Sequence, residues 1–255
     1  YQIDNEDVIL EKGAGFNLVQ KLLALSSDKF EIEVVLISKN NADTGMRIYN
    51  SIEHYGLDIR KAAFTAGEGT AKYVLNFNAC LFLSTDPEEV QTAIDSGVAA
   101  ATILDSKTTT KETELRIAFD ADAVLFDNGS ENVYRQEGLE AFIKNEKENM
   151  DVCLNPGPFL NFLNAIHALQ SHYPRIGNPI KTAIVTARGI PTGKRVINSL
   201  RQFGIRVDES YFLAGGQKGQ ILKSFEADIF FDDMMQNCDE AREHVATGHV
   251  PYKNQ

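Results

Sequence analysis

Residues 181–204, KTAIVTARGIPTGKRVINSLRQFG, join a β-rich run to a helical pattern and have a second copy in the chain. The run TAIVT is short, apolar and β-branched, which is typical of a buried strand. In GKRVINSLRQFG the apolar residues have helical spacing and a glycine ends the pattern. The stretch EVVLISKNNADTGMRIYNSIEHYG, from Glu33, repeats this arrangement. A strand–helix unit that occurs twice indicates an internally duplicated α/β protein.

The two copies keep one register, in which Ser38 corresponds to Thr186, 148 positions later, and no gap is needed. Identical residues extend beyond the quoted stretch in that register. They are Thr44, Gly45, Arg47, Asn50, Ser51, Gly56, Phe64, Ala66, Gly67, Phe77, Ala79 and Phe82, which recur as Thr192, Gly193, Arg195, Asn198, Ser199, Gly204, Phe212, Ala214, Gly215, Phe225, Ala227 and Phe230. Duplication explains this better than chance.

Strand and helix alternate through both copies. The second copy continues with the strand SYFLA, the short helix QILKSFE, the strand ADIFFD and a helix from Met235 to about Val245. The first copy repeats the order from VVLIS to the closing strand AAATIL, with KYVLNFN in place of the short helix. Apolar strands that alternate with helices predict an α/β fold with Rossmann-like parallel sheets and flanking helices.

We expect two tandem related halves, residues 1–107 and 108–255, with the polar run SKTTTKETE (106–114) as the join. The second half opens with LRIAFDADAVLF, a predicted strand, and an insertion at about 125–155 is expected to form a small cap. The first half lacks a counterpart of that opening strand, so we expect it to be incomplete at its N-terminus.

The composition is that of a soluble globular protein. Hydrophobic residues make up 43% and charged residues 24%, as in globular proteins. With 25 Lys and Arg against 36 Asp and Glu, the net charge of −11 argues against binding nucleic acid polymers or anionic membranes. No apolar run reaches a membrane span or a signal peptide, so a cytoplasmic location is expected. Three cysteines, far apart, are expected to be buried reduced thiols.

Reactive side chains follow the strands of the second copy at their carboxyl ends, where ligands bind in open parallel sheets. These groups are Asp120-Ala121-Asp122, Thr186-Ala187-Arg188, Lys218 within GGQKG, and Asp232-Asp233. Each motif alone has an ordinary explanation: DxD and DD are commonly loops or helix caps, and GGQKG lacks the Ser or Thr of a triphosphate-binding loop. Their common order and placement favour catalysis.

We call the sheet edge formed by these carboxyl ends the rim. Clustered carboxylates repel one another, and a bound divalent cation removes that repulsion, so the acids of the rim predict a Mg²⁺ site. Asp120 would attack phosphorus, and Asp122 would protonate the leaving oxygen and then activate water. We expect metal ligands from Asp120, Asp232 and Asp233, together with the backbone carbonyl of Asp122. The predicted phosphate contacts come from Thr186, Ala187, Arg188 and Lys218.

The first half provides an internal control for this prediction. The counterpart of Lys218 is Thr70, and those of Asp232 and Asp233 are Ser84 and Thr85. The first half therefore keeps the scaffold residues but lacks the lysine and the metal acids. We expect one active site, in the second half.

The four motifs, DxD, Thr186, Lys218 and the acidic pair, resemble those of the haloacid dehalogenase-like phosphatases. FDADAVLF, IVTARGIPTGKRVINSL, FLAGGQKGQILKSF and DIFFDD look more closely like the cytosolic 5′-nucleotidase I family, and the likeness extends over nearly the whole chain. The resemblance implies Mg²⁺-dependent hydrolysis of nucleoside 5′-monophosphates such as AMP, and it favours a homo-oligomer.

Substrate contacts are less well defined by the sequence. Asn128, with Ser130 and Glu131, follows the nucleophile closely enough to reach a ribose, although solvated loop residues would look the same. In the first half, Lys39-Asn40-Asn41 and AGEGTAKY are candidates to complete the pocket. Two other functions stay open: a phosphatase of the same chemistry for another phosphorylated metabolite, and a non-catalytic nucleotide-binding protein.

Overall fold

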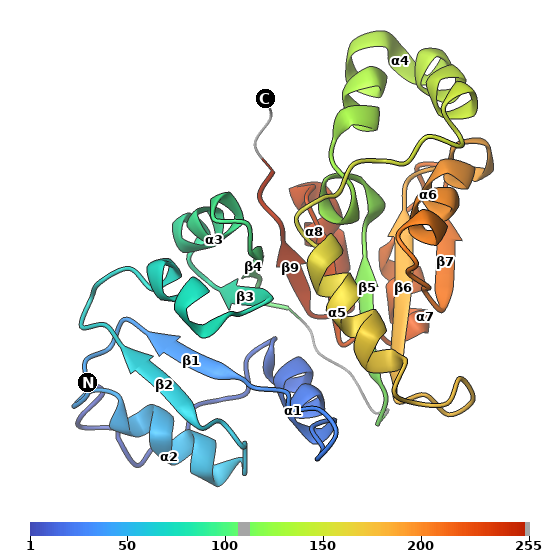
Figure 1. The fold of residues 1–255 in the computed structure, drawn as a ribbon. Coiled ribbons are helices and arrows are strands. Elements are labelled where there is room, and N and C mark those ends of the chain that lie inside the picture. The colour runs from blue at the N-terminus through green and yellow to red at the C-terminus, as the bar shows by residue number, and fades with distance from the viewer. Residues whose placement is uncertain (107–112, 253–255) are drawn as a thin grey trace.

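The structure, a computed structural model, describes residues 1–106 and 113–252, so most of the predicted join lies outside the described residues. Its centre is a seven-stranded sheet in the order β3-β4-β9-β8-β5-β6-β7 (Figure 1). All neighbouring strands are parallel except β4 and β9. The strands are β3 (Leu81–Ser84), β4 (Ala99–Ile103), β5 (Leu115–Phe119), β6 (Ile180–Thr186), β7 (Glu209–Phe212), β8 (Ile229–Asp232) and β9 (Thr247–His249). The predicted α/β fold with a mostly parallel sheet is confirmed.

Helices cover both faces of this sheet, because successive strand residues point to opposite sides. Ile117 and Phe119 of β5 pack with α1 (Phe16–Ala24), α5 (Leu160–Gln170) and α6 (Ile190–Gln202). Ala118, between them, packs on the other face with α7 (Gly219–Phe225) and the residues that follow α8 (Met235–Ala241). This burial fixes the register of β5 and therefore the position of the residue that follows it.

Residues of the first copy contribute to two sheets. β1 (Val35–Ser38) and β2 (Lys61–Phe64) form a separate parallel pair, beside α2 (Met46–His54). β3 and β4, with α3 (Pro87–Asp95), extend the seven-stranded sheet. In the repeat register, β1 corresponds to β6, β2 to β7 and β3 to β8. The division into two halves stays a prediction.

The repeat register also appears in local geometry. A Cβ added at Gly45 would lie 2.5 Å from the Phe64 ring, and one added at Gly193 would lie 2.6 Å from the Phe212 ring. Both glycines thus let a helix approach the aromatic residue at the end of a neighbouring strand. Ala66 and Ala214 both have left-handed backbones, with φ of 51° and 49°. The two copies therefore share their turns and close contacts as well as their sequence.

A second shared feature is a set of three side chains on the helix that bind the main chain of a preceding segment. In the second copy, Arg195, Asn198 and Ser199 bind Val152 O, Met150 O and Leu154 N at 2.9, 3.0 and 2.9 Å. In the first copy, Arg47, Asn50 and Ser51 bind Val8 O, Glu6 O and Leu10 N at 2.7, 2.8 and 3.0 Å. We call each set the main-chain clamp. In this segment the copies correspond with an offset of 144 rather than 148.

The insertion after β5 contains α4 (Gly129–Glu148), which is two helical segments joined at Gly138, where φ is 86°. In Figure 1, β7 ends at the upper edge of the sheet, and α4 lies above that edge. Because β5 and β6 run parallel to β7, their carboxyl ends are at the same edge. The insertion is therefore placed over the predicted catalytic rim.

Several boundaries differ from the predictions. The opening strand ends at Phe119, and residues 121–125 form a tight turn, with left-handed Ala123, instead of continuing the strand. KYVLNFN gives two short 3-10 turns, η1 (Ala71–Tyr73) and η2 (Leu75–Phe77), in place of a helix. The last helix ends at Ala241, and β9 was not predicted. The expectation of buried thiols holds for Cys238, whereas Cys80 is exposed and Cys153 is half-buried.

Candidate active site

Asp120, Asp232 and Asp233 form one carboxylate cluster, in which one oxygen from each lies within 4.8 Å of the others. Asp120 follows β5 directly and Asp232 ends β8, and these strands are parallel neighbours with Phe119 opposite Phe231. The backbone N–H of Asp120 donates to Phe231 O at 2.8 Å. The sheet therefore brings together acids that are 112 positions apart in the sequence.

Lys218 bridges two of these acids. Its Nζ lies 2.6 Å from Asp232 Oδ2 and 2.9 Å from Asp120 Oδ1, and its side chain is 2% exposed. Burial alone would lower the pKa of Lys218, but the two carboxylates hold it above its ordinary value, so the lysine is charged. The backbone N–H groups of Lys218 and Gly219 donate to the carboxylate of Glu240, which fixes the start of α7.

The carboxylate cluster carries more negative charge than Lys218 offsets. Burial raises the pKa of Asp120 to about 7, with Asp232 and Asp122 adding to the shift and Lys218 opposing it. Burial, followed by the charges of Asp120 and Asp232, raises the pKa of Asp233 to about 8. A bound divalent cation would relieve this repulsion, and a set of carboxylate oxygens suits a hard cation such as Mg²⁺. The residues present therefore fit the predicted metal.

Thr186 ends β6 on the same edge, with its side chain buried. Its Oγ1 accepts from the backbone N–H of Arg188 at 3.2 Å, and Ala187 between them is exposed. The loop is tied to the one after β7, since Gly215 N donates to Ala187 O at 2.8 Å and Ala214 N to Arg188 O at 3.2 Å. Thr186 and Ala187 thus lie in a rigid turn beside the rim.

Asp122 and the side chain of Arg188 bind each other. Arg188 Nε donates to Asp122 Oδ2 at 2.8 Å, and Nη2 donates to Asp122 Oδ1 at 2.6 Å. The Arg188 side chain is 2% exposed. Arg188 Nη1 donates to Glu146 of α4 and to Thr192 O, the latter at 3.3 Å. Glu146 also accepts from Arg195 at 2.9 Å and from Ser130 at 2.9 Å. The guanidinium of Arg188 thus binds two carboxylates and one backbone carbonyl.

The structure places the predicted ribose contacts in different environments. Asn128 is half-buried at the start of α4, where its Oδ1 accepts from Asn132. Ser130 is buried and donates to Glu146, so its hydroxyl is occupied. Glu131 pairs with Arg135 at 2.6 Å, and its negative charge makes a small contribution to the raised pKa of Asp233.

The first-half candidates bind one another. Lys39 Nζ pairs with Asp86 at 2.6 Å and with Glu89 at 3.2 Å. Glu89 in turn accepts from the backbone N–H groups of Thr70 and Ala71 in AGEGTAKY. Lys39 and the two backbone N–H groups, which from the sequence were candidates to bind a substrate, therefore have partners within the protein. A contribution of the first half to the substrate pocket stays a prediction.

Sequence reasoning missed several supporting residues. Asn237 donates Nδ2 to both Asp232 oxygens at 3.1 Å, and Glu240 holds the backbone of Lys218. Both lie on α8, five and eight positions after Asp232, and this closeness in the sequence was the one signal available for finding them. Glu146 is a buried acid inside a polar helix, and nothing in the sequence pattern distinguishes it from its exposed neighbours.

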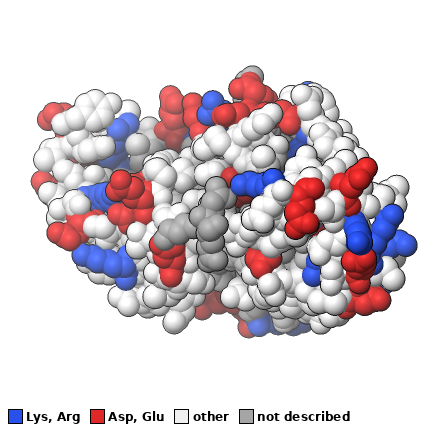
Figure 2. Space-filling view, turned by 90° about the horizontal axis from the view of Figure 1, so that it is seen from above, with Lys and Arg blue, Asp and Glu red and all other residues white. Residues whose placement is uncertain are grey.

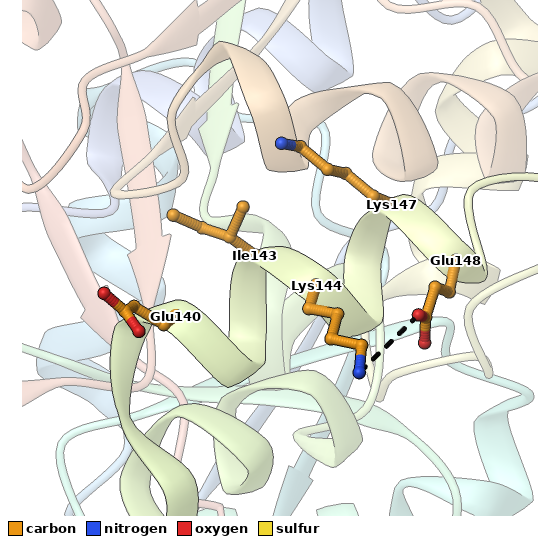
Figure 3. Close-up of a pocket in the computed structure, with 5 residues that line it drawn as sticks. All are labelled: Glu140, Ile143, Lys144, Lys147 and Glu148. Carbon is orange, nitrogen blue, oxygen red and sulfur yellow. Dashed lines mark ion pairs between the residues drawn. The ribbon is translucent and has the colours of Figure 1, made fainter.

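Two surface hollows lie near α4. One, of about 470 Å³, is lined by Glu140, Ile143, Lys144, Lys147 and Glu148, which all project from one helix (Figure 3). Lys144 pairs with Glu148 there at 3.9 Å. The other, of about 360 Å³, lies where α4 joins the body of the protein and includes Ser130, Asn145 and Arg195 in its lining. Neither is lined by the carboxylate cluster.

The architecture and rim define an α/β protein with a carboxylate–lysine centre at the carboxyl ends of its parallel strands. Comparison with known proteins adds that the family model described as 5′-nucleotidase matches residues 1–255, and the chain belongs to this family. It is similar to human cytosolic 5′-nucleotidase 1B, with 37% identity over 257 aligned residues, which cover 95% of this chain. The alignment covers 42% of that relative's length. No solved structure matches the chain.

Two further observations bear on what the protein contacts. Among residues 1–106 and 113–252, no helix combines the length and the apolar character that a bilayer crossing requires. On the face in Figure 2, the basic side chains of the described residues are scattered among acidic ones and form no continuous stripe.

Proposed function

We propose that this chain hydrolyses nucleoside 5′-monophosphates, AMP among them, to nucleoside and phosphate with Mg²⁺ as cofactor and Asp120 as nucleophile. The observation that carries the proposal is the bridge from Lys218 to both Asp120 and Asp232, beside Asp233. Phosphoryl transfer requires mainly positioned charge, and this rim combines a buried cation with a nucleophile and metal ligands. Family membership supports the nucleotide as the substrate class.

In the proposed reaction, an Asp120 carboxylate oxygen attacks phosphorus while the bond from phosphorus to the ribose 5′ oxygen breaks. Asp122 gives that oxygen a proton, and the nucleoside leaves. Asp122 then takes a proton from water, whose oxygen attacks the aspartyl-phosphate, so that phosphate is released and Asp120 is restored. The balance is one water consumed for each phosphate formed.

Each neighbouring group has a proposed task. Lys218 holds the Asp120 carboxylate in place and offsets charge on the phosphate oxygens. Thr186 and the backbone of Ala187 and Arg188 line the phosphate site. Asp120, Asp232 and Asp233, with the Asp122 carbonyl, would hold Mg²⁺, which supplies positive charge to neutralise the transferring phosphate. Asn128 is proposed to reach the nucleoside.

The wider assignments are also proposals. The human relative is named cytosolic, and we infer the same compartment for this chain. We propose that residues 108–255 form the catalytic haloacid dehalogenase-like half, with residues 1–107 as a related half that lacks the catalytic lysine. A homo-oligomer is proposed from the resemblance alone.

The test is phosphate release from a panel of AMP, IMP, dAMP and glucose 6-phosphate, with and without Mg²⁺, for the wild type and Asp120→Asn. We expect Mg²⁺-dependent release from the nucleotides, which Asp120→Asn abolishes and Asp239→Asn, at an exposed position, preserves. Strong preference for the sugar phosphate would replace the substrate class. Unchanged release by Asp120→Asn would overturn the mechanism.

A further inference from the structure

We infer that Glu146, in the insertion helix α4, is a positioning residue that orients Asp122 through Arg188, so that the general acid is aligned only when α4 is seated on the core. The inference deepens the proposed function and rests on it. In this inference the side chain of Arg188 binds Asp122 and not the substrate. The insertion then contributes to the chemical step by holding the general acid in position.

The geometry is a chain of ion pairs from α4 to the rim. Glu146 Oε2 pairs with Arg188 Nη1, and the other edge of the same guanidinium binds both oxygens of Asp122 at 2.6 and 2.8 Å. A guanidinium is planar and rigid, so a partner on one edge fixes the direction of the donors on the other. The Phe142 ring, also on α4, lies 5.3 Å from Arg188 Cζ and contacts the group from a third side.

Glu146 is itself held on several sides. Its side chain has no exposed surface, and Oε1 accepts from Ser130 at 2.9 Å, from Asn145 at 3.1 Å and from Arg195 at 2.9 Å. A buried carboxylate is costly unless it is paired, and here two arginines and a hydroxyl satisfy it. Such a group is rigid enough to transmit its position to Arg188.

The first copy separates a structural role from a catalytic one. Its main-chain clamp is intact, with Arg47 in the place of Arg195. In the clamp register the counterpart of Glu146 is Gln2, which Arg47 contacts at 3.5 Å, and in the repeat register the counterpart of Arg188 is Asn40. The clamp therefore forms without the charged pair.

The second copy, which has the carboxylate cluster and Lys218, has the charged pair Glu146–Arg188. The first copy, which lacks the cluster and the lysine, has the neutral residues Gln2 and Asn40 in its place. A pair needed only to fold the segment would be needed equally in both copies. Its presence in one copy points to the chemistry of the rim, where the group it reaches is Asp122.

The distinguishing experiment compares two leaving groups. The alkoxide of AMP is a poor leaving group and needs a proton from Asp122, whereas p-nitrophenolate leaves without one. Glu146→Gln is expected to lower kcat/KM for AMP by about tenfold or more, a part of the roughly 100-fold or larger contribution of a general acid. For p-nitrophenyl phosphate we expect kcat/KM within about threefold of wild type, because kcat/KM reports the steps through formation of the aspartyl-phosphate and not its hydrolysis, which both substrates share.

Arg188→Lys is the second variant, because it keeps the charge but cannot bind Asp122 with two parallel donors. It should show the same split in kcat/KM between the substrates, whereas a substrate-binding role for the Arg188 side chain would lower kcat/KM for both substrates alike. Gln2→Ala is the matched control in the first copy and should leave both rates unchanged. Melting temperatures of all variants verify that each is folded at the assay temperature.

Equal losses for the two substrates in Glu146→Gln and Arg188→Lys, or no loss in either, would overturn the inference. A wild type that cleaves p-nitrophenyl phosphate but no nucleotide would instead overturn the proposed function. In that event the same split is measured against an alkyl phosphate that the enzyme does cleave, and it decides the inference independently.

Discussion

Lys218 Nζ lies 2.6 Å from Asp232 Oδ2, and neither side chain has more than 2% of its surface exposed. The lysine immediately precedes α7 and the aspartate ends β8, so the pair joins two elements at the edge of the sheet. The same Nζ reaches Asp120 at 2.9 Å. One buried cation therefore sets the spacing of the proposed nucleophile and a proposed metal ligand.

Lys218→Met should lower phosphate release by roughly 100- to 1,000-fold, because it removes a charge that is already in position when phosphate charge is redistributed. It also leaves Asp120 and Asp232 without their shared partner. Steady-state kinetics with AMP and Mg²⁺ is the measurement, and Lys223→Met, at an exposed position of the same helix, is the control. Retention of more than about a tenth of the wild-type rate would contradict this role.

Asp232→Asn should remove the increase in melting temperature that Mg²⁺ causes, and this measurement does not depend on enzymatic activity. A cation that binds the folded state raises the melting temperature, and the wild type should show this shift when Mg²⁺ replaces EDTA. The variant lacks one carboxylate of the cluster and should show little or no shift, whereas Asp239→Asn should behave as wild type. An equal shift in all three proteins would place the cation elsewhere.

In the absence of metal, the contribution of Asp233 to the free energy of unfolding should fall as the pH rises. Burial and neighbouring charges raise the pKa of Asp233 to about 8, against 3.8 for an ordinary Asp. Between about pH 4 and 8 the unfolded chain has released a proton that the folded protein still holds, so the contribution of this group is complete below pH 4 and is lost toward pH 8.

Asp233→Asn removes this titration. Its free energy of unfolding in EDTA, relative to wild type, should increase by at least about 2 kcal/mol from pH 4 to 8, since each pKa unit corresponds to about 1.4 kcal/mol. Urea titrations at several pH values measure it. A difference that is constant with pH would show that Asp233 titrates normally.

Gly193→Ala should destabilise the protein by about 1–3 kcal/mol, because the added Cβ would lie 2.6 Å from the Phe212 ring and one of them must move. Gly45→Ala should act similarly through Phe64, at 2.5 Å. Gly13→Ala, where a Cβ meets nothing within 4 Å, should change stability by less than about 0.5 kcal/mol. Thermal and urea unfolding measure these changes. If Gly193→Ala and Gly13→Ala changed the free energy of unfolding equally, the close approach of Gly193 to Phe212 would not constrain this position.

The parts of the site that the sequence predicted are those that the sheet alone determines. Each of three site residues ends a strand or directly follows one: Asp120, Thr186 and Asp232. Parallel neighbouring strands bring such residues to one edge of the sheet, independently of the other contacts in the chain. Lys218 was predicted from its order among the other motifs. The carboxylate cluster that results is therefore the portion that follows from strand alternation.

What the sequence did not predict depends on contacts between distant segments. The partner of Arg188 in α4 is 42 positions away and lies in an insertion whose path has no periodic signal. KYVLNFN stands where the other copy has a short helix, yet it forms two 3-10 turns, beside which Ala71 and Val74 are buried. β9 is three residues long, too short for a recognisable pattern, and it exists because β4 and β8 both pair with it.

The main-chain clamp has a consequence for how such a protein can change. Arg47 and Asn50 bind backbone carbonyls, and Ser51 binds the backbone N–H of Leu10. The bound segment can therefore keep its path when its side chains change, provided that residue 10 is not proline. Under the proposed duplication, such anchoring would let the first copy lose reactive side chains and still keep its fold.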